Sequence, residues 1–286
     1  MKNILIQFDT DAVPSTFDRV VAIDAGVDEL FSYGDISPVN VESLVHGAIF
    51  TRGMKDLQHT AIFIGGGQVA DGEALLKKVN KTFFGPMRVS VMMDSNGSNT
   101  TAAAAVLAAK RHVPLAGLSA LVLGGTGPVG HRVAQILASQ GSLVRVASRN
   151  LERAQHTCET IRGVVPNGQL VACSTNSEAE LQDACADVSL IVAAGAAGVE
   201  LLSEAKWREL SLLKVLIDLN AVPPLGIGAV QVMDKGVEHH GVICYGALGV
   251  GGTKMKIHKA AINKLFEANN QVLDTAAIYA IGEKLE

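Results

Sequence analysis

The sequence predicts an α/β protein with mostly parallel sheets and two domains. Short β-like runs alternate with helical stretches along the chain. A glycine-rich turn at 124–130 follows an apolar run and precedes a helical stretch. Two helical stretches near the C-terminus, 254–266 and 274–284, have no obvious strand to follow. We expect them to pack back on the N-terminal half, so that residues 1–105 and 255–286 form one domain, residues 106–254 form the other, and a cleft lies between them.

The N-terminal half contains the expected strands and helices of the first domain. Gly65-Gly66-Gly67 directly follows one apolar run, which indicates a tight strand-to-helix turn. The alanine-rich stretch 98–111 predicts a closely packed helix that connects the two domains. The expected strands are 3–8, 60–64 and 88–92, and the expected helices are 40–45 and 71–83.

In the middle of the chain, expected strands and helices continue to alternate, as in a nucleotide-binding domain. Its first strand, 118–123, leads into the glycine-rich turn. The further expected strands are 143–147, 169–173, 188–193 and 214–218, and the expected helices are 129–140, 151–161 and 178–185.

Composition indicates an ordinary globular protein. Of 286 residues 48% are hydrophobic and 18% charged, and the formal net charge is −4, which offers no basic surface for nucleic acid. The short N-terminal apolar run is followed by Asp9 and Asp11, unlike a secretory signal, and no apolar stretch is long enough to span a membrane. Neither nucleic acid nor a membrane is an expected partner, and a cytoplasmic location is expected.

The cysteines and histidines show no metal-ligand spacing. The four cysteines contain no C-x-x-C pair, which argues against disulfides and structural zinc. His239 and His240 are interpreted as part of a solvated loop. No metal site is predicted.

The turn at 124–130 is the strongest functional signal. Gly125, Gly127 and Gly130 fit G-x-G-x-x-G between a predicted strand and a predicted helix, and Thr126, Pro128 and Val129 fill the variable positions. Glycine lets the backbone approach a pyrophosphate, which then lies at the helix N-terminus. The alternative is a purely structural turn. The context favours a Rossmann-type dinucleotide site.

The next strand predicts which dinucleotide binds. It ends in Ser148 and Arg149, where an acidic residue would bind the ribose 2′-hydroxyl of NAD. A hydroxyl and a guanidinium suit a 2′-phosphate, so NADP is the predicted cofactor. The run 193–198 also ends a strand, and Ala194 and Gly195 are placed near the nicotinamide, although helix–strand packing explains small residues there equally well.

Two further segments are candidate substrate-binding elements. Residues 94–101 are rich in polar side chains; one helix cap needs a single such residue, so a recognition loop facing the cleft is expected. Lys254 and Lys256 follow a glycine-rich stretch that is interpreted as a loop, at the start of a predicted helix. One of them is expected at the mouth of the cleft, although an ordinary solvated lysine is the alternative.

Seven strings of residues resemble one known family in the same order. They are FDTDAVPSTFD (8–18), IFTRG (49–53), AIFIGGG (61–67), DSNGSNTTAAA (94–104), GGTGPVG (124–130), NAVPPLGIG (220–228) and GALGVGGTKMKIH (246–258). They resemble the NADP-dependent methylene-tetrahydromethanopterin dehydrogenases of methylotrophic bacteria, some of which also accept methylene-tetrahydrofolate. The resemblance implies a pterin-binding domain made from both chain ends, an inserted Rossmann domain and a homo-oligomer, a trimer or a hexamer.

The implied reaction is hydride transfer from a pterin-bound methylene group to NADP in one-carbon (formaldehyde) metabolism. The two pterin nitrogens stabilise the methenyl cation, so no general base is required and the protein mainly positions the reactants. The resemblance implies an early pterin-side role for Phe17 and Asp18. By motif position, substrate-binding or positioning roles fall on Asp94, Ser95, Asn96, Ser98 and Lys256, and a cofactor role falls on Asn220.

Alternatives are narrowed by residues that the chain lacks. Related bifunctional folate enzymes open the methenyl ring with a Tyr-x-x-x-Lys pair, and no tyrosine here has a lysine four residues on. Little or no cyclohydrolase activity is therefore predicted. A shikimate- or amino-acid-type dehydrogenase would need a Lys-Asp proton-transfer pair, for which adjacent Lys55 and Asp56 are poor candidates. A protein that senses NADP without turnover is the other alternative. No single residue discriminates the two pterin carriers.

Overall fold

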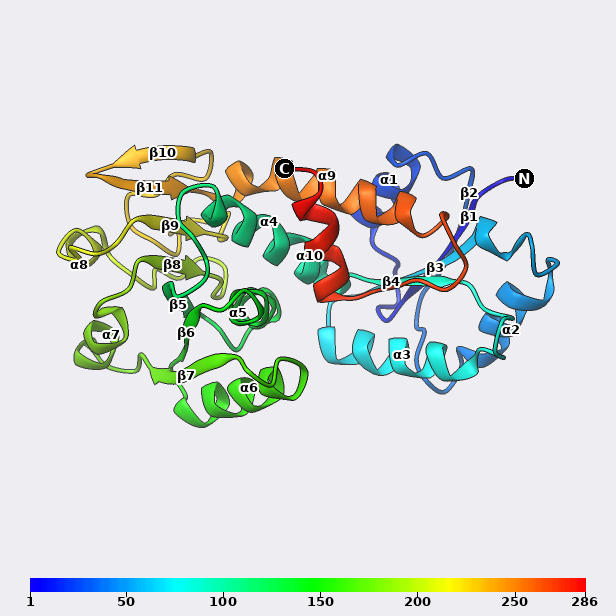
Figure 1. Cartoon of the computed structure of the whole chain (residues 1–286), viewed down its shortest axis with the longest axis horizontal. Coiled ribbons are helices and arrows are strands. Elements are labelled where there is room, and N and C mark those ends of the chain that lie inside the picture. Colours follow the sequence, from blue (N-terminus) through cyan, green and yellow to red (C-terminus); the bar gives the residue numbers. More distant parts are fainter. The chain divides into compact units, whose positions relative to one another are not determined.

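The computed structural model describes all 286 residues and divides them into two compact units (Figure 1). The first unit contains residues 1–100 and 255–286, and the second contains residues 101–254. The chain passes from one unit to the other inside two helices, α4 (Ser98–Lys110) and α9 (Ala247–Lys264). An α/β fold with parallel sheets is confirmed in both units.

The first unit is built on a five-stranded parallel sheet with the order β12-β4-β3-β1-β2. All six residues of β3 are buried, as is typical of a central parallel strand covered on both faces. The strands are β1 (Ile4–Asp9), β2 (Glu29–Tyr33), β3 (Thr60–Gly65), β4 (Ser90–Met93) and β12 (Val272–Leu273).

The helices of the first unit follow the predicted alternation, with additions. A helix over residues 16–24 was not predicted from the sequence, and neither was β12, which lies between the last two helices. A two-residue strand is too short for a periodicity signal. The helices are α1 (Thr16–Asp24), α2 (Glu42–Phe50), α3 (Val69–Thr82) and α10 (Thr275–Glu283), with 3-10 turns at Leu57–His59 and Ser95–Gly97.

The second unit has a seven-stranded sheet with the order β10-β11-β9-β8-β5-β6-β7. Strand β10 is antiparallel to β11 and the other strands are parallel. The strand order reverses direction between β5 and β8, which is the switch point where doubly wound sheets bind ligands. The strands are β5 (Ser119–Leu123), β6 (Leu143–Ser148), β7 (Gln169–Ser174), β8 (Leu190–Ala193), β9 (Val215–Asp218), β10 (Lys235–His239) and β11 (Val242–Tyr245).

The hairpin of β10 and β11 corrects the interpretation of the two adjacent histidines. His239 is the last residue of β10, and its Nε2 lies 2.8 Å from Oδ2 of Asp234. His240 forms the turn with a φ of 52°, and its Nε2 lies 3.2 Å from Oε1 of Glu204. Both histidines therefore have structural contacts within the second unit.

The helices of the second unit cover its sheet. They are α5 (Pro128–Ser139), α6 (Leu151–Val164), α7 (Glu178–Cys185) and α8 (Glu204–Trp207). Trp207 is 1% exposed in the core, and its Nε1 donates a hydrogen bond of 2.8 Å to the Gly228 carbonyl. No helix of either unit is both long enough and apolar enough to cross a bilayer.

Helix α9 begins earlier than the sequence predicts. The glycine-rich stretch before Lys254 belongs to the helix, which starts at Ala247. A Cβ on Gly249 would lie 1.7 Å from the Asp234 carbonyl oxygen, so this glycine is required by close packing and not by a loop conformation. Lys254 and Lys256 consequently lie in the second and third turns of α9 rather than at its start.

Candidate functional site

The glycine-rich turn after β5 is in close backbone contact with its surroundings. Gly124 has a φ of +69°, and a Cβ there would lie 2.6 Å from the Gly195 Cα in the turn after β8. A Cβ on Gly130 would lie 2.4 Å from the Gly124 carbonyl oxygen, and one on Gly125 would lie 2.8 Å from a methyl of Val146. Both turns at the switch point therefore depend on glycine for packing.

The N-terminus of α5 fits an anion such as a pyrophosphate. Gly127 is its N-cap and supplies no side-chain hydrogen bond, and Pro128 at the first helical position has no N–H. The remaining first-turn N–H groups have no partner within the helix, and the helix dipole favours negative charge there. Thr126 and Val129 are half-buried beside this end. The residues present can thus hold the phosphates of a dinucleotide.

Two arginine side chains at and just after the end of β6 make no hydrogen bond or ion pair within the protein. Ser148 is partly buried, and its Oγ accepts a hydrogen bond of 3.2 Å from the Asn150 N–H. Arg149 is exposed, and its guanidinium makes no hydrogen bond or ion pair. The same is true of Arg153, in the first turn of α6, whose side chain was missed in the sequence. The sequence did contain a signal for Arg153, because it lies in the first turn of the helix that follows Ser148 and Arg149.

Arg153 lines a cavity of about 480 Å³ between the glycine-rich turn and α6. One acidic side chain, Glu152, is in this lining, together with three basic ones. The lining residues are Thr126, His131, Glu152, Arg153, His156, Thr157 and Thr160. A predominantly basic cavity between the glycine-rich turn and the first turns of α6 suits a phosphate group.

The turns after β8 and β9 are held by internal hydrogen bonds. The Ala194 N–H donates to the Leu123 carbonyl at 2.9 Å, which ties the β8 end to β5. Asn220 is buried, and its side chain accepts from the Val222 N–H and donates to the Pro224 carbonyl. Asn220 therefore shapes its own loop.

Asp218 anchors the start of the same loop. Its carboxylate accepts hydrogen bonds from the N–H groups of Asn220 and Ile227 at 3.0 and 2.9 Å. Burial raises the pKa of the Asp218 carboxyl, and the backbone hydrogen bonds act in the opposite direction. Asp218 was not singled out in the sequence, although its place at a strand end was visible there.

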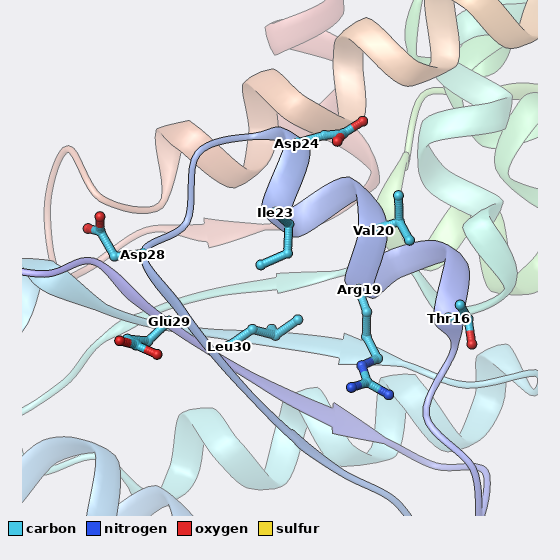
Figure 2. Close-up of a pocket in the computed structure, with 8 residues that line it drawn as sticks. All are labelled: Thr16, Arg19, Val20, Ile23, Asp24, Asp28, Glu29 and Leu30. Carbon is cyan, nitrogen blue, oxygen red and sulfur yellow. The ribbon is translucent and has the colours of Figure 1, made fainter.

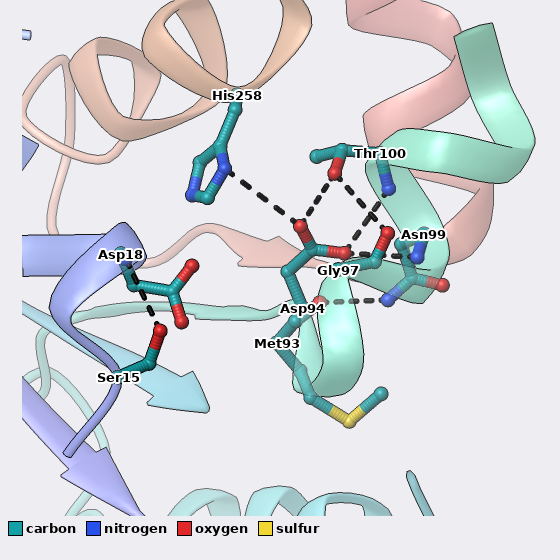
Figure 3. Close-up of polar contacts among 8 residues, drawn as sticks. All are labelled: Ser15, Asp18, Met93, Asp94, Gly97, Asn99, Thr100 and His258. Carbon is teal, nitrogen blue, oxygen red and sulfur yellow. Dashed lines mark hydrogen bonds and ion pairs between the residues drawn. The ribbon is translucent and has the colours of Figure 1, made fainter. Parts of the chain in front are cut away.

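The polar segment after β4 turns inward (Figure 3). The Asp94 carboxylate accepts hydrogen bonds from the Asn99 and Thr100 N–H groups at 2.8 and 3.0 Å and from the Thr100 hydroxyl at 2.6 Å. Asp94 and Ser95 are fully buried, and the Ser95 hydroxyl donates to the Gly65 carbonyl at 3.2 Å. The expectation of an open recognition loop is therefore wrong for these residues, which instead start helix α4.

Two polar side chains of this segment make no hydrogen bond within the protein. The Asn96 side chain is exposed, on a residue with a φ of 55° whose N–H donates to the Gly66 carbonyl at 2.7 Å. The Ser98 hydroxyl is buried and has no hydrogen-bond partner. A buried hydroxyl without a partner is uncommon, because leaving it unpaired costs free energy.

A buried histidine lies beside Asp94 and was missed in the sequence. The His258 ring is fully buried, and its Nδ1 lies 3.9 Å from Asp94 Oδ2 (Figure 3). It stacks on Phe63, with ring centroids 5.7 Å apart, and it lies against the Phe17 ring in a tilted arrangement, with ring centroids 6.4 Å apart. His258 is the last residue of the string 246–258 that resembles the family, so its position was visible in the sequence. A lone histidine, however, carries no periodicity signal.

The remaining predicted substrate residues lie on α1 and α9. Phe17 is 49% exposed in the first turn of α1, next to the partly buried Asp18, whose N–H donates to Ser15 Oγ. In Figure 3 the Asp18 carboxylate is directed toward the space beside Asp94 and His258. Lys256 is exposed, and its ammonium makes no hydrogen bond or ion pair. No group of three or more His, Cys, Asp or Glu side chains is arranged to hold a metal ion.

Comparison with known proteins finds full-length relatives. A family model described as methylene-tetrahydromethanopterin dehydrogenase, N-terminal, matches residues 16–96. The chain is 45% identical over 286 residues to the bifunctional protein MdtA of Methylorubrum extorquens, covering 99% of each sequence. It is 31% identical over 281 residues to the NAD(P)-dependent methylenetetrahydromethanopterin dehydrogenase of the same organism, covering 95% of this chain and 94% of the relative.

Among solved structures, the shikimate 5-dehydrogenase of Listeria monocytogenes in complex with shikimate and NAD has a similar fold. The TM-score is 0.54 at 13% identity, covering 100% of this chain and 96% of that one. At this identity the similarity shows the fold alone, and it confirms the predicted Rossmann-type architecture.

Proposed function

The chain belongs to the methylene-tetrahydromethanopterin dehydrogenase family, and on this basis we propose that it oxidises methylene-tetrahydromethanopterin to the methenyl form with NADP. The enzyme is an oxidoreductase of one-carbon metabolism. The observation that carries the proposal is the family relationship over nearly the entire chain. We propose methylene-tetrahydrofolate as a second substrate, because it contains the same reacting five-membered ring.

The second unit supplies the NADP site. The N-terminus of α5 would hold the pyrophosphate. Ala194 and Gly195 follow β8 at the switch point of the sheet, where the nicotinamide half would bind. Ser148, Arg149 and Arg153 would bind the 2′-phosphate with one hydroxyl and two unpaired guanidinium groups. When bound, NADP supplies the acceptor carbon for the hydride.

The first unit supplies the pterin side. The exposed Phe17 ring can pack on the pterin, and the Asp18 carboxylate can accept hydrogen bonds from its ring N–H groups. Asn96, Ser98 and Lys256 are additional polar groups that their own unit leaves unused. Asp94 and Ser95 act indirectly, because their side chains are buried in internal hydrogen bonds.

The chemistry requires positioning more than proton transfer. Loss of hydride leaves a cation that the two flanking nitrogens of the pterin share, so no base needs to remove a proton. Figure 3 shows the Asp18 carboxylate directed toward Asp94, whose own carboxylate is held by the Asn99 and Thr100 N–H groups. The negative charge of Asp18 would stabilise a developing cation there. Because the reaction removes no proton from the pterin, it requires no catalytic triad.

The decisive experiment follows NADPH absorbance with methylene-tetrahydromethanopterin or methylene-tetrahydrofolate as substrate. NADPH formation is expected with both carriers, and the ratio of the kcat/KM values gives the preference. No turnover with either carrier, together with tight NADPH binding, would contradict the proposal and favour a sensing protein. In the same assay, methenyl-pterin hydrolysis is expected at the uncatalysed rate, because the Tyr-x-x-x-Lys pair is absent.

Preference for NADP over NAD is tested at the 2′-phosphate site. Arg149→Ala and Arg153→Ala should each raise the KM for NADP roughly 10- to 100-fold, since a hydrogen bond to a charged group contributes about 1.5–3 kcal/mol. The KM for NAD should change little. Arg208→Ala is the matched control, because Arg208 is an exposed arginine of the same unit that pairs with Glu204. Equal effects on both dinucleotides would remove that arginine from the site.

A homo-oligomer completes the proposal. The family resemblance implies a trimer or a hexamer, and the measurement is sedimentation of the native protein over a range of concentrations. A monomer at all concentrations would contradict it.

A further inference from the structure

The cavity between the glycine-rich turn and α6 contains a second unpaired side chain beside Arg153. His156 lines the same cavity of about 480 Å³, and its imidazole makes no hydrogen bond or ion pair. Residues three positions apart on a helix are neighbours on its surface, so the two side chains lie on the same face of α6. An anion that binds to Arg153 in this cavity would therefore lie beside His156 as well.

The threonines of α6 that line this cavity use their hydroxyl protons within the helix. The Thr157 hydroxyl donates to the Arg153 carbonyl at 2.9 Å, and the Thr160 hydroxyl donates to the His156 carbonyl at 3.0 Å. These two hydroxyls therefore offer a ligand no hydrogen-bond donor. The basic side chains of the lining are Arg153 and His156 on α6 and His131 on α5, and a phosphate in the cavity would depend on them.

The ionisable groups around His156 belong to α5 and α6. On α6, Glu152 lies four positions before it and Glu159 three positions after it, and both are exposed. Arg153 of α6 and His131 of α5 line the cavity with it. The two carboxylates favour the protonated imidazole and the two basic groups oppose it. A bound phosphate would add negative charge and so favour the protonated form of His156.

A second cavity, in the first unit, has the opposite balance of charge. It lies between α1 and β2 and has a volume of about 580 Å³. Its charged lining residues are three carboxylates and one guanidinium, those of Asp24, Asp28, Glu29 and Arg19 (Figure 2). Like charges repel, so this acidic cavity disfavours a phosphate. Of these two cavities, the one beside α6 is the one that suits an anion.

We propose that His156 is a specificity-determining residue for NADP, and that its protonated imidazole binds the 2′-phosphate together with Arg153. The inference rests on the NADP site proposed above. Imidazole is the side chain that ordinarily changes charge between about pH 5 and 8. When protonated it donates from both nitrogens and forms a charge-assisted hydrogen bond to phosphate. NAD carries a hydroxyl instead of this phosphate, so discrimination against NAD gains a contribution from His156 as the pH falls from 8.0 to 6.5.

The test measures the Kd of NADPH and of NADH by isothermal titration calorimetry at pH 6.5 and 8.0, at constant ionic strength, with the full-length protein. His156→Gln keeps a hydrogen-bond donor but cannot be protonated. It should weaken NADPH binding about three- to tenfold at pH 6.5 and less than about twofold at pH 8.0, because the interaction is exposed and requires the charged ring.

NADH binding should change little at either pH, because NADH lacks the 2′-phosphate. Both proteins meet the same ligand, so protonation of the phosphate itself cancels in the comparison. Titrations at pH 7 in buffers of different ionisation enthalpy should show that the native protein takes up roughly half a proton more than His156→Gln on binding NADPH. His240→Asn is the matched control, since His240 is an exposed histidine of the same unit that contacts Glu204, and it should match the native protein.

Three results with His156→Gln would overturn the proposal. An NADPH affinity equal to that of the native protein at both pH values would exclude His156 from the site. An equal loss at pH 6.5 and 8.0 would show that the charge of the ring plays no part, and equal losses for NADPH and NADH would place it away from the 2′-phosphate. A native protein that binds NADPH no more tightly than NADH would instead contradict the proposed 2′-phosphate site itself, and this inference with it.

Discussion

Burial should decide how much a helix-starting aspartate contributes to stability, and this chain offers a matched pair. Asp94 accepts hydrogen bonds from the Asn99 and Thr100 N–H groups and the Thr100 hydroxyl, and it is fully buried. Asp274 accepts hydrogen bonds from the Ala276 and Ala277 N–H groups, both at 3.1 Å, and it is exposed. Both residues lie in the first unit and stabilise the N-terminal turn of a helix.

The magnitudes follow from what each substitution leaves unsatisfied. Asp94→Ala leaves two buried N–H groups without an acceptor, at about 1–3 kcal/mol each, and it removes the carboxylate near His258. The Thr100 hydroxyl can instead donate to the Gly97 carbonyl, 3.4 Å away. For Asp94→Ala the expected loss in the free energy of unfolding is about 4 kcal/mol. Asp274→Ala exposes its N–H groups to water, so the expected loss is about 1 kcal/mol.

The assay is urea unfolding at neutral pH, followed by far-UV circular dichroism. Asp94→Asn is an informative third variant, because an amide oxygen still accepts from the two N–H groups while the charge is lost. It should lose about 1–2 kcal/mol and fall between the native protein and Asp94→Ala. Equal losses for Asp94→Ala and Asp274→Ala would refute the reasoning that burial sets the cost.

Two further outcomes are expected. Gly130→Ala places a Cβ 2.4 Å from a backbone oxygen and should weaken NADPH binding more than about tenfold in a titration. Gly163→Ala is the control, because a Cβ there has nothing within 4 Å; it should raise the free energy of unfolding by about 0.5–1 kcal/mol and leave NADPH binding unchanged. Equal NADPH affinities of the two variants would contradict the packing argument. Burial raises the pKa of Cys244 from 9.0 to about 12, so above pH 9 the unfolded thiol loses its proton before the folded one does, and stability falls by about 1.4 kcal/mol per pH unit. Urea unfolding of Cys244→Ala at pH 8 and 10 should show a shallower fall than the native protein; parallel pH dependence would reject this contribution.

Much of the fold could be predicted because parallel sheets bury their strands. Continuous apolar runs such as 60–64 and 143–147 marked strands to within a residue at each end. The hairpin at 235–245 was missed, because β10 is largely exposed and carries no apolar alternation. Helix α9 was predicted too short, because glycine lowers helix propensity and its packing against a distant carbonyl is invisible in sequence.

The candidate site was predictable where local sequence sets the chemistry. The glycine turn and the Ser148–Arg149 ending follow from strand, turn and helix in succession. The polar segment at 94–101 was misleading, because side chains that cap a helix from inside are the same types that recognise ligands. His258 depends on packing between residues more than 150 positions apart, which no local pattern encodes.

Trp207, buried against the Gly228 carbonyl, is the sole tryptophan of the chain, and it belongs to the second unit. Intrinsic tryptophan emission therefore reports on the second unit alone, while circular dichroism reports on both. If the two signals change at different urea concentrations, the first unit unfolds separately from the second. One indole thus gives the enzyme a built-in spectroscopic label for half of its structure, with no engineering required.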